Sequence, residues 1–504
     1  MVTTQSANVL AQNESIVIKN PVSGEVVGIV PVTSREEVSA AVARARAAQP
    51  AWGALPVKER GRFLRRWGDL LWERQAEAMR MIRRETGKND TGAFMEILGI
   101  DNTVNYCVQK APRLLRPEKR KPLFPIVQRA RVYHKPRGVV GFITPWNYPM
   151  ALVMMDVIPA LIAGNTVVIK PSELTPHTAL FAINLFQEIG FPKDVAQIVM
   201  GDGRTGEALV DCVDYISFTG STATGRKVAK RSAERLIPYN LELGGKDAMI
   251  VLKDANIELA AASVLIGACE NAGQMCVSIE RVYVEAPVYD QFVERVLYYA
   301  RQLKVGSGDG FDVHVGSMTN ERELLRVEAH IQDALAKGAK LLFGGRRLPE
   351  LGPLFFEPGI LVEVDHSMRI MTEETFGPLI PIMKVADAEE AVRWANDCEY
   401  GLSGLIFTGD FAQGQRLATR LNTGDISINR AGAVMGAPHL PWGGQKASGI
   451  GRRGGPEGIL RFTTTQSVVT DTQIGFKPAL ALLDPFTLRL LRVMRRARRI
   501  FPFL

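Results

Sequence analysis

The chain has 504 residues, which exceeds the usual size of a single hydrophobic core and predicts two large lobes. Its five cysteines are widely spread, which argues against a disulfide framework and against a metal site with paired ligands. Six of the positive charges behind the net charge of +8 are arginines in the last twenty residues. The body of the chain is therefore nearly neutral, and its charge gives no indication of nucleic-acid binding.

Residues 1–20 contain neither a basic n-region nor an apolar h-region, so we expect no secretory signal. No apolar run is long enough to cross a bilayer. Together with the unpaired cysteines, these features predict a reducing compartment and a cytoplasmic protein.

The first part of the chain is predicted to be helical. Ser34 and Glu37 form a capping-box pattern, which marks the start of the first helix. Apolar residues at helical spacing then predict helices over residues 34–48, 51–85 and 96–106. Residues 118–136 are rich in Lys, Arg and β-prone residues and predict a two-stranded arm that leaves the lobe.

Short apolar runs then alternate with segments of helical length, which predicts a parallel, doubly wound sheet with helices on both faces. Ligands bind such sheets at the carboxyl ends of the strands. A second alternating set over residues 257–429 predicts a second α/β lobe. In the first lobe we predict strands over residues 139–143, 166–169, 196–200 and 215–218, followed by candidate loops at 145–149, 170–173, 201–204 and 220–225.

Cys276 is the candidate nucleophile. Attack of its thiolate on an aldehyde would give a hemithioacetal, and loss of a hydride from this species would give a thioester. Hydrolysis of the thioester would then release the acid. Met275 and Val277 flank it, and apolar surroundings raise the pKa of a thiol, so a base or a dipole must assist. Cys269 lies in an apolar run and is interpreted as a structural cysteine.

Two polar residues could complete this chemistry. Asn147, between two prolines after the first strand, could donate to an oxyanion, although Asn is also a common turn residue. Glu242, set between two leucines, would have a raised pKa suited to a general base. The structural alternative for Glu242 is an ion pair with Lys246 four residues later.

Two loops could hold a dinucleotide. Residues 218–225 follow a strand and open a helix, where backbone N–H groups and the Ser221 hydroxyl could bind a phosphate. Lys170 and Glu173 follow another strand and could bracket a ribose. Glu173 would repel a 2′-phosphate and favours NAD over NADP, whereas Arg204 argues in the other direction.

Taken together, the motifs Pro145-Trp-Asn-Tyr-Pro149, Leu241-Glu-Leu-Gly-Gly-Lys246, Gly273-Gln-Met-Cys276 and Glu373-Glu-Thr-Phe-Gly-Pro378 resemble those of the aldehyde dehydrogenase superfamily from about residue 16 to 469. The resemblance implies a nucleophilic Cys276, a general base Glu242 and an oxyanion donor Asn147. It implies NAD as cofactor, with NADP possible. The cofactor contacts that it implies are Trp146, Lys170, Ser172, Glu173, Gly203, Gly220, Ser221, Gly225, Glu374 and Phe376.

The resemblance also implies a domain organisation with two Rossmann-like lobes and a small β oligomerisation arm, and hence a homodimer or homotetramer. The boundaries expected are residues 1–117 and 138–245 for the dinucleotide-binding domain, 246–445 for the catalytic domain, 118–137 and 446–471 for the arm, and 472–504 for a basic amphipathic extension. Apolar residues at helical spacing among the arginines of residues 485–504 predict contact with a membrane surface. The alternatives are packing over a subunit or the substrate entrance, and disorder.

The substrate is predicted to be an apolar aliphatic aldehyde of medium or long chain, or an aromatic aldehyde. Semialdehyde-specific members often carry an arginine in the helix after the Pro-Trp-Asn motif, where this chain has Met155. Succinic semialdehyde stays an alternative, because Arg430 or His439 could supply the missing charge. Two further alternatives are an acylating enzyme that uses coenzyme A and a non-catalytic, membrane-associated scaffold.

Overall fold

A computed structural model describes residues 14–123, 127–308, 310–434 and 436–471, together with six separate positions between 485 and 495. The chain divides into two compact units. The larger unit comprises Met1–Leu115 and Pro136–Thr464, and the smaller comprises Arg116–Lys135 and Thr465–Leu504. All of the predicted site residues belong to the larger unit.

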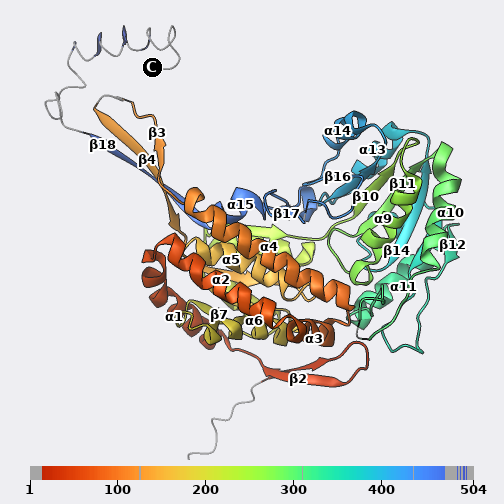
Figure 1. Ribbon diagram of the computed structural model, residues 1–504, viewed down its shortest axis with the longest axis horizontal. Helices are drawn as coiled ribbons and strands as arrows, with labels where there is room; N and C mark the ends of the chain where they lie inside the picture. Colours follow the sequence, from red (N-terminus) through yellow and green to blue (C-terminus); the bar gives the residue numbers. More distant parts are fainter. Residues whose placement is uncertain are drawn as a thin grey trace, which may run out of the picture. The chain divides into compact units, whose positions relative to one another are not determined.

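The first lobe of the larger unit is built on a six-stranded sheet in the order β17-β9-β8-β5-β6-β7 (Figure 1). Four of its five strand pairings are parallel, and the fifth, between the edge strand β17 and β9, is antiparallel. This confirms the predicted doubly wound sheet and brings the loops after β5, β6 and β8 to one edge. The strands are β5 (Val139–Ile143), β6 (Thr166–Lys170), β7 (Ala196–Ile198), β8 (Tyr215–Thr219), β9 (Tyr239–Glu242) and β17 (Gly449–Ile450).

The helices of this lobe differ from the prediction in three places, one of which is the predicted helix over residues 96–106, which extends over Asp90–Leu114. The first helix continues through Pro50, because Trp52 is buried and its Nε1 donates to the backbone oxygen of Leu161 at 3.0 Å. The predicted helix over residues 51–85 is divided at Arg74. The elements are a ribbon of β1 (Ser15–Lys19) and β2 (Val26–Pro31), then α1 (Arg35–Ala54), α2 (Val57–Glu73), α3 (Gln75–Thr86), α4 (Asp90–Leu114), α5 (Ala151–Ile162), α6 (Pro176–Glu188), α7 (Gly203–Val210), α8 (Thr222–Glu234) and α15 (Gly455–Leu460).

The second lobe is built on a seven-stranded sheet in the order β12-β13-β14-β11-β10-β15-β16, which confirms a second α/β lobe (Figure 1). The central strands are buried on both faces, as expected for parallel strands covered by helices. Its strands are β10 (Asp247–Val251), β11 (Ile279–Glu285), β12 (Lys340–Phe343), β13 (Gly359–Val362), β14 (Leu379–Val385), β15 (Gly404–Phe407) and β16 (Ser427–Ile428). Its helices are α9 (Ile257–Cys269), α10 (Tyr289–Ala300), α11 (Glu321–Ala336), α12 (Arg369–Thr372), α13 (Ala388–Asn396) and α14 (Phe411–Ala418).

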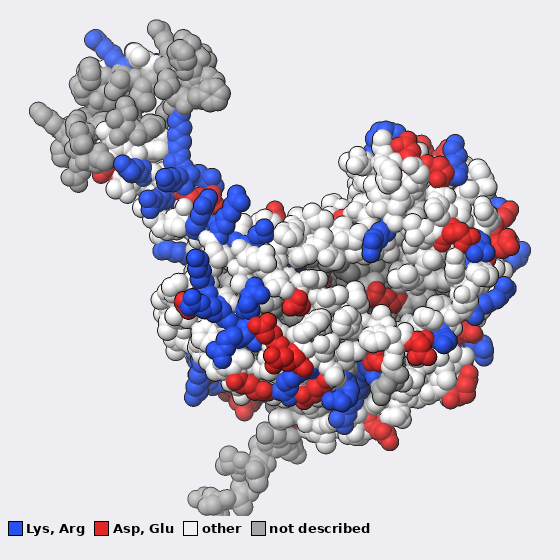
Figure 2. All heavy atoms as spheres, in the orientation of Figure 1, with Lys and Arg blue, Asp and Glu red and all other residues white. Residues whose placement is uncertain are grey.

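The smaller unit contains a three-stranded sheet in the order β18-β4-β3, formed by β3 (Glu118–Arg120), β4 (Gln128–Pro136) and β18 (Thr463–Asp471). Residues 446–464, predicted as part of the arm, belong instead to the larger unit, because β17 pairs with β9. The arm is strongly basic: residues 116–135 contain seven Lys or Arg and one Glu, and Figure 2 shows these cations gathered over it. Positive charge is therefore not confined to the C-terminal extension.

Most of the extension over residues 472–504 lies outside the described residues. The six positions described there, Pro485, Leu488, Arg489, Arg492, Val493 and Arg495, are helical and exposed. The predicted membrane contact of residues 485–504 stays a prediction. Among the described helices, none has the length and apolar character needed to span a membrane.

Candidate functional site

The turn before Cys276 has a strained backbone. After α9, Asn271, Ala272 and Gly273 adopt φ angles of 51°, 54° and 72°. A left-handed backbone is unfavourable for alanine, and such strain concentrates at functional sites. Cys276 follows this turn, is half-buried and lines a cavity of about 360 Å³.

Two glycines allow three motif segments to meet. A Cβ atom on Gly273 would lie 2.3 Å from the backbone of Gly377, and one on Gly245 would lie 2.1 Å from the carbonyl oxygen of Cys276. Neither position has room for a side chain without movement of the backbone beside it. The segments that lie against one another are therefore residues 241–246, 273–276 and 373–378.

Asn147 is buried in the loop after β5 and is fixed against the Cys276 turn. Its Nδ2 donates to the backbone oxygen of Gln274 at 2.9 Å, and Asn271 Nδ2 donates to the backbone oxygen of Asn147 at 3.0 Å. A carboxamide has two N–H donors, so one bond to Gln274 leaves a second donor for an oxygen bound beside Cys276. This fixed position favours an oxyanion donor over an ordinary turn residue.

A buried ion pair supports the Asn147 loop. Lys88 Nζ lies 2.6 Å from Glu96 Oε1 and donates to the backbone oxygen of Asn147 at 2.8 Å. Glu96 Oε2 accepts hydrogen bonds from the N–H groups of Met150 and Ala151 at 3.1 and 2.9 Å. Loss of one partner from such a pair costs about 3–5 kcal/mol, because the other charge stays buried without compensation. The pair therefore holds both ends of the loop.

Glu242, the last residue of β9, is buried. Its Oε1 accepts a hydrogen bond from Asn240 Nδ2 at 3.2 Å, whereas its buried Oε2 has no partner among the described residues. Burial raises the pKa of Glu242 to about 7, although Arg453 and Arg461 oppose the rise. A carboxylate with a free oxygen and a pKa near neutrality can accept a proton at physiological pH.

Lys246 pairs with Glu280 and not with Glu242, so the structural alternative for Glu242 was wrong. Lys246 Nζ lies 2.6 Å from Glu280 Oε2 and donates to Thr375 Oγ1 at 3.0 Å. Glu280 also accepts the N–H groups of Thr375 and Phe376 at 2.7 and 2.8 Å. This buried pair therefore positions the segment that carries Glu374 and Phe376.

Glu374 contacts the segment 241–246, and Phe376 contacts Trp146, which is itself a predicted cofactor residue. Glu374 Oε1 accepts the N–H of Gly245 at 2.9 Å, and burial raises the pKa of Glu374 to about 8. The ring of Phe376 meets that of Trp146 edge to face, with centroids 5.6 Å apart. The segment 373–378 therefore contacts both the segment 241–246 and the segment 145–149.

Cys276 and Cys269 have similarly raised thiol pKa values, but only Cys276 is accessible from the cavity. Burial raises the pKa of both Cys276 and Cys269 to about 12; for Cys276, Asp247 adds to the rise and Arg453 opposes it. Cys269 is 3% exposed and packs in the core of the second lobe. Cys276 alone of the two lines the cavity, and its neutral thiol needs a base before it can attack.

A second charge cluster lies near Glu242. Arg453 binds Asp156 through Nε at 3.0 Å and Nη2 at 2.7 Å, and Arg461 pairs with the same carboxylate. Burial alone would raise the pKa of Asp156, but the two arginines outweigh it and the pKa is lowered. Two guanidinium groups on one carboxylate leave a net positive charge, which favours the ionised form of Glu242.

Three of the predicted cofactor residues lie at the carboxyl end of β6. Lys170 Nζ lies 3.4 Å from Glu173 Oε2, and burial lowers the pKa of Lys170. Ser172 is buried and its Oγ accepts the N–H of Leu174 at 3.2 Å. A cation and a carboxylate are therefore brought together at this strand end, as the sequence predicts.

The next strand end holds Gly203 and Arg204. Gly203 begins α7 after the N-cap Asp202, and a Cβ atom there would meet nothing within 4 Å. Arg204 pairs with Asp202 at 3.0 Å and with Glu14. Its charge is therefore already partnered, which weakens the argument for NADP drawn from Arg204.

The loop after β8 has the form of an anion site. Ser221 caps α8 and accepts the N–H of Thr224 at 3.4 Å, so the first turn of the helix faces this loop. A Cβ atom on Gly225 would lie 2.4 Å from Leu243, and one on Gly220 would lie 2.7 Å from the ring of Phe218. The glycines therefore keep this strand-to-helix turn compact.

The cavity beside Cys276 is mostly apolar. Met155 lines it, where semialdehyde-specific relatives of the motif would place an arginine, and the predicted Arg430 and His439 are not among its described lining residues. Within the described lining, Arg453 is the only cation, while Glu96 and Glu270 are the carboxylates. The apolar lining comes from Met95, Leu98, Tyr106, Leu152, Met155, Pro159, Ile266, Met275, Trp442 and Ile459.

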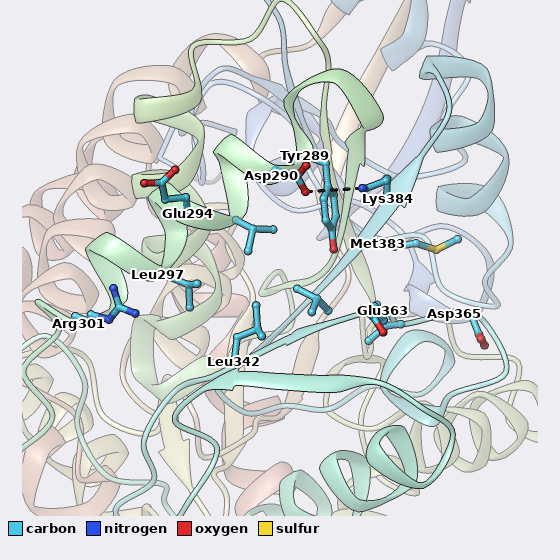
Figure 3. Close-up of a pocket in the computed structure, with 13 residues that line it drawn as sticks. Tyr289, Asp290, Glu294, Leu297, Arg301, Leu342, Glu363, Asp365, Met383 and Lys384 are labelled. Carbon is cyan, nitrogen blue, oxygen red and sulfur yellow. Dashed lines mark ion pairs between the residues drawn. The ribbon is translucent and has the colours of Figure 1, made fainter.

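A larger cavity of about 860 Å³ lies elsewhere, between α10 and the strands β12, β13 and β14 (Figure 3). Its lining includes Tyr289, whose ring lies 4.4 Å from Lys384 Nζ, and Asp290, which lies 3.8 Å from the same ammonium. None of the predicted site residues lines it. The predicted nucleophile Cys276 and the predicted oxyanion donor Asn147 line the smaller cavity instead.

Several charged residues around the site were missed from the sequence, among them Lys88, Arg453 and Glu270. Lys88 lies 59 residues from its partner Asn147, and Arg453 lies 297 residues from Asp156, so neither contact has a local signal. Glu270 had one: a carboxylate directly after α9 lies at the negative end of the helix dipole, where it is unfavourable.

Comparison with known proteins gives consistent matches over most of the chain. A model of the aldehyde dehydrogenase family matches residues 9–468. A relative from Mycobacterium ulcerans (strain Agy99), provisionally named succinate-semialdehyde dehydrogenase (NADP+) 2, is 42% identical over 462 residues, covering 91% of this chain and 89% of the relative. A Methylomonas relative named 4,4'-diapolycopene aldehyde oxidase is 39% identical over 466 residues, covering 91% of this chain and 86% of the relative. The solved structure of a Mycobacterium tuberculosis aldehyde dehydrogenase complexed with NAD+ has a TM-score of 0.87 at 36% identity, covering 93% of this chain and 96% of that one.

Proposed function

Because the chain belongs to the aldehyde dehydrogenase family and is an NAD(P)-dependent oxidoreductase, we propose that Cys276, Glu242 and Asn147 carry out its reaction. The observation that carries this proposal is that Cys276 and Asn147 line one cavity, while the buried carboxylate of Glu242, whose pKa is raised, acts electrostatically on the Cys276 thiol. Membership of the family favours an enzyme over the non-catalytic scaffold.

The reaction begins with transfer of the Cys276 thiol proton to Glu242. The sulfur then forms a bond to the aldehyde carbon, and negative charge passes to the carbonyl oxygen, which accepts hydrogen bonds from Asn147 Nδ2 and the Cys276 N–H. Loss of the hydrogen on that carbon as hydride leaves a thioester. Glu242 then releases the first proton to solvent and takes a second one from water, whose oxygen attacks the thioester. The carbon–sulfur bond breaks, the acid is released, and Glu242 returns its proton to the departing Cys276 thiolate.

When bound, the nicotinamide cofactor supplies the hydride acceptor. The residues proposed to hold it fit such a group: the start of α8 with Ser221 suits a phosphate, and Lys170 with Glu173 suits a ribose. Glu374, beside the Gly245 N–H, and Phe376, against Trp146, would hold the nicotinamide half. Glu173 supports a preference for NAD, and the name of the Mycobacterium ulcerans relative supports NADP.

We propose a neutral, apolar aldehyde as the substrate. The supporting observation is the cavity lining, which is mostly methionine, leucine, isoleucine and aromatic side chains. Apolar lining with a few placed polar groups is typical of sites for apolar ligands. The name of the Methylomonas relative, which includes an aldehyde of diapolycopene, points in the same direction.

Succinic semialdehyde is the second candidate, and the names of the relatives favour it over the apolar reading. The provisional name of the Mycobacterium ulcerans relative includes this substrate. Arg453 lines the cavity and could contact a carboxylate, although its Nε and Nη2 already bind Asp156.

A substrate panel separates the two candidates. With NAD+ and NADP+ tested in parallel, we expect decanal and hexanal to give a kcat/KM at least about tenfold above that of succinic semialdehyde, since each buried methylene contributes about 0.8 kcal/mol. Formation of reduced cofactor is followed by absorbance. Activity confined to succinic semialdehyde would overturn the apolar reading and leave the Cys276 chemistry intact. Release of an acyl-coenzyme A in place of the acid would support the acylating alternative.

We also propose that the arm joins a second copy of the chain. β18 is an edge strand of the arm sheet, and its Val468 and Val469 are 38% and 57% exposed. An exposed apolar edge is a template for pairing with another chain. Light scattering should therefore give the mass of a dimer or tetramer, and Val469→Lys should lower it. A monomer mass for the unaltered protein would contradict this proposal.

A further inference from the structure

Glu270 places an unpaired carboxylate in the cavity of Cys276. It follows α9 directly, is half-buried and lines the same cavity as Cys276 and Asn147. Its Oε1 accepts a hydrogen bond from the hydroxyl of Tyr148 at 3.1 Å. Within the described part of the chain, no Lys, Arg or His forms an ion pair with it. A carboxylate is thus presented to the substrate space with a neutral partner only.

This position is unfavourable for a carboxylate on local grounds. The residue after a helix lies at the negative end of the helix dipole, where a cation would be stabilising and an anion is not. An apolar cavity adds a desolvation cost. Side chains that break a local rule without a structural partner are found preferentially at functional positions.

Lys88 interacts electrostatically with Glu270 but forms no ion pair with it among the described residues. Lys88 lies buried under the Tyr148 ring, with its Nζ 3.7 Å from the ring centroid. The same ammonium lies 2.6 Å from Glu96 Oε1 and 2.8 Å from the backbone oxygen of Asn147. Its charge is balanced by Glu96, so Lys88, Glu96 and Glu270 together leave one negative charge at this side of the cavity.

The cation on the other side is also engaged. Arg453 uses Nε and Nη2 to bind Asp156, and Nη2 further donates to Thr219. Arg453, Arg461 and Asp156 together keep one positive charge, and this charge acts on the carboxylate of Glu242. At the Glu270 side of the cavity, a terminal carboxylate would meet a like charge that has no ion-pair partner among the described residues.

We propose that Glu270 is a specificity-determining residue that repels aldehydes with a terminal carboxylate and so restricts the substrate to neutral aldehydes. The proposal rests on the proposed function, because it concerns discrimination at the same cavity. Two like charges about 6–8 Å apart at an effective dielectric constant of about 20 change a rate or a binding constant by about 10- to 100-fold. The proposed exclusion runs against the substrate in the name of the Mycobacterium ulcerans relative.

The test compares substrates that differ only in charge. Succinic semialdehyde is paired with its methyl ester, and 10-oxodecanoic acid is paired with its methyl ester. For the unaltered enzyme we expect kcat/KM to favour each ester by about 10- to 100-fold. Glu270→Gln should reduce this preference by about tenfold or more, mainly by raising kcat/KM for the acids. Glu270→Asp, which keeps the charge, should retain most of it.

Salt provides a second readout that a purely steric role would not change. Raising the ionic strength from about 0.01 M to about 0.5 M should weaken the preference for the ester in the unaltered enzyme and leave it constant in Glu270→Gln. An equal preference in Glu270→Gln and the unaltered enzyme, or a preference of the unaltered enzyme for the acids, would overturn the proposal. Absence of turnover with all four aldehydes, and with decanal, would instead contradict the proposed function.

Discussion

Replacing Cys276 by alanine is expected to reduce kcat with any aldehyde by about 10⁴-fold or more, the scale seen when a covalent nucleophile is removed. The physical reason is that neither of the later steps exists without the carbon–sulfur bond: hydride loss starts from the hemithioacetal, and hydrolysis starts from the thioester. The fold should be unaffected, because the half-buried Cys276 is replaced by a smaller apolar residue. Steady-state formation of reduced cofactor measures the loss, and thermal unfolding checks the fold.

Cys269→Ala is the matched control. Burial raises the pKa of this thiol to about 12, as it does for Cys276, so a difference between the variants cannot come from thiol acidity. Cys269 packs in the core, and its replacement should cost some stability while leaving kcat within a few-fold. If Cys269→Ala lost turnover and Cys276→Ala kept it, the assignment of the nucleophile would be wrong.

Glu242→Gln is expected to lower kcat by about 10²- to 10⁴-fold, because general base catalysis contributes on this scale. Glutamine keeps the size of the side chain and can keep its contact with Asn240, so the loss reports proton transfer and not packing. Turnover that falls less than about threefold would exclude Glu242 as the base.

The same carboxylate predicts a pH dependence. Only the ionised form of Glu242 accepts a proton, and burial raises the pKa of this group to about 7, so kcat should fall as the pH drops below about 7. This limb should disappear in Glu242→Gln. Glu374 titrates in a similar window, since burial raises its pKa to about 8, so Glu374→Gln is the necessary control. Persistence of the limb in Glu242→Gln together with its loss in Glu374→Gln would assign it to Glu374.

The sequence predicts the fold well where local patterns decide it. Runs of buried β-branched residues such as Val139–Ile143 and Thr166–Lys170 alternate with helical segments, and only a parallel sheet covered on both faces accommodates that pattern. The same rule brings the loops of Asn147 and Lys170 to one edge, because both follow parallel strands. The close approach of the motif segments was also predictable from their glycines. Gly245 and Gly273 leave room for a neighbouring backbone but not for a side chain of their own.

The partners of the charged groups could not be predicted, because they depend on tertiary contacts. Lys246 has a carboxylate four residues away in the sequence and binds Glu280 instead, since Glu242 lies on a strand and not on the same helix face. Helix ends were uncertain for the same reason: burial of Trp52 outweighs the local effect of Pro50. Residues 446–464 were wrongly assigned to the arm, because nothing in the neighbouring sequence indicates that β17 pairs with the distant strand β9.

The measurement that tests the central claim most directly is intact-protein and peptide mass spectrometry of the Glu242→Gln variant after mixing with decanal and NAD+ or NADP+. Loss of the base slows deprotonation of the Cys276 thiol and leaves the later hydrolysis without a group to activate water. Over a long incubation the thioester should therefore accumulate as one decanoyl group on the peptide that contains Cys276, with one equivalent of reduced cofactor formed per modified chain. An acyl group on another residue, or reduced cofactor formed through many turnovers without any adduct, would contradict the assignment of Cys276 as the nucleophile and Glu242 as the base.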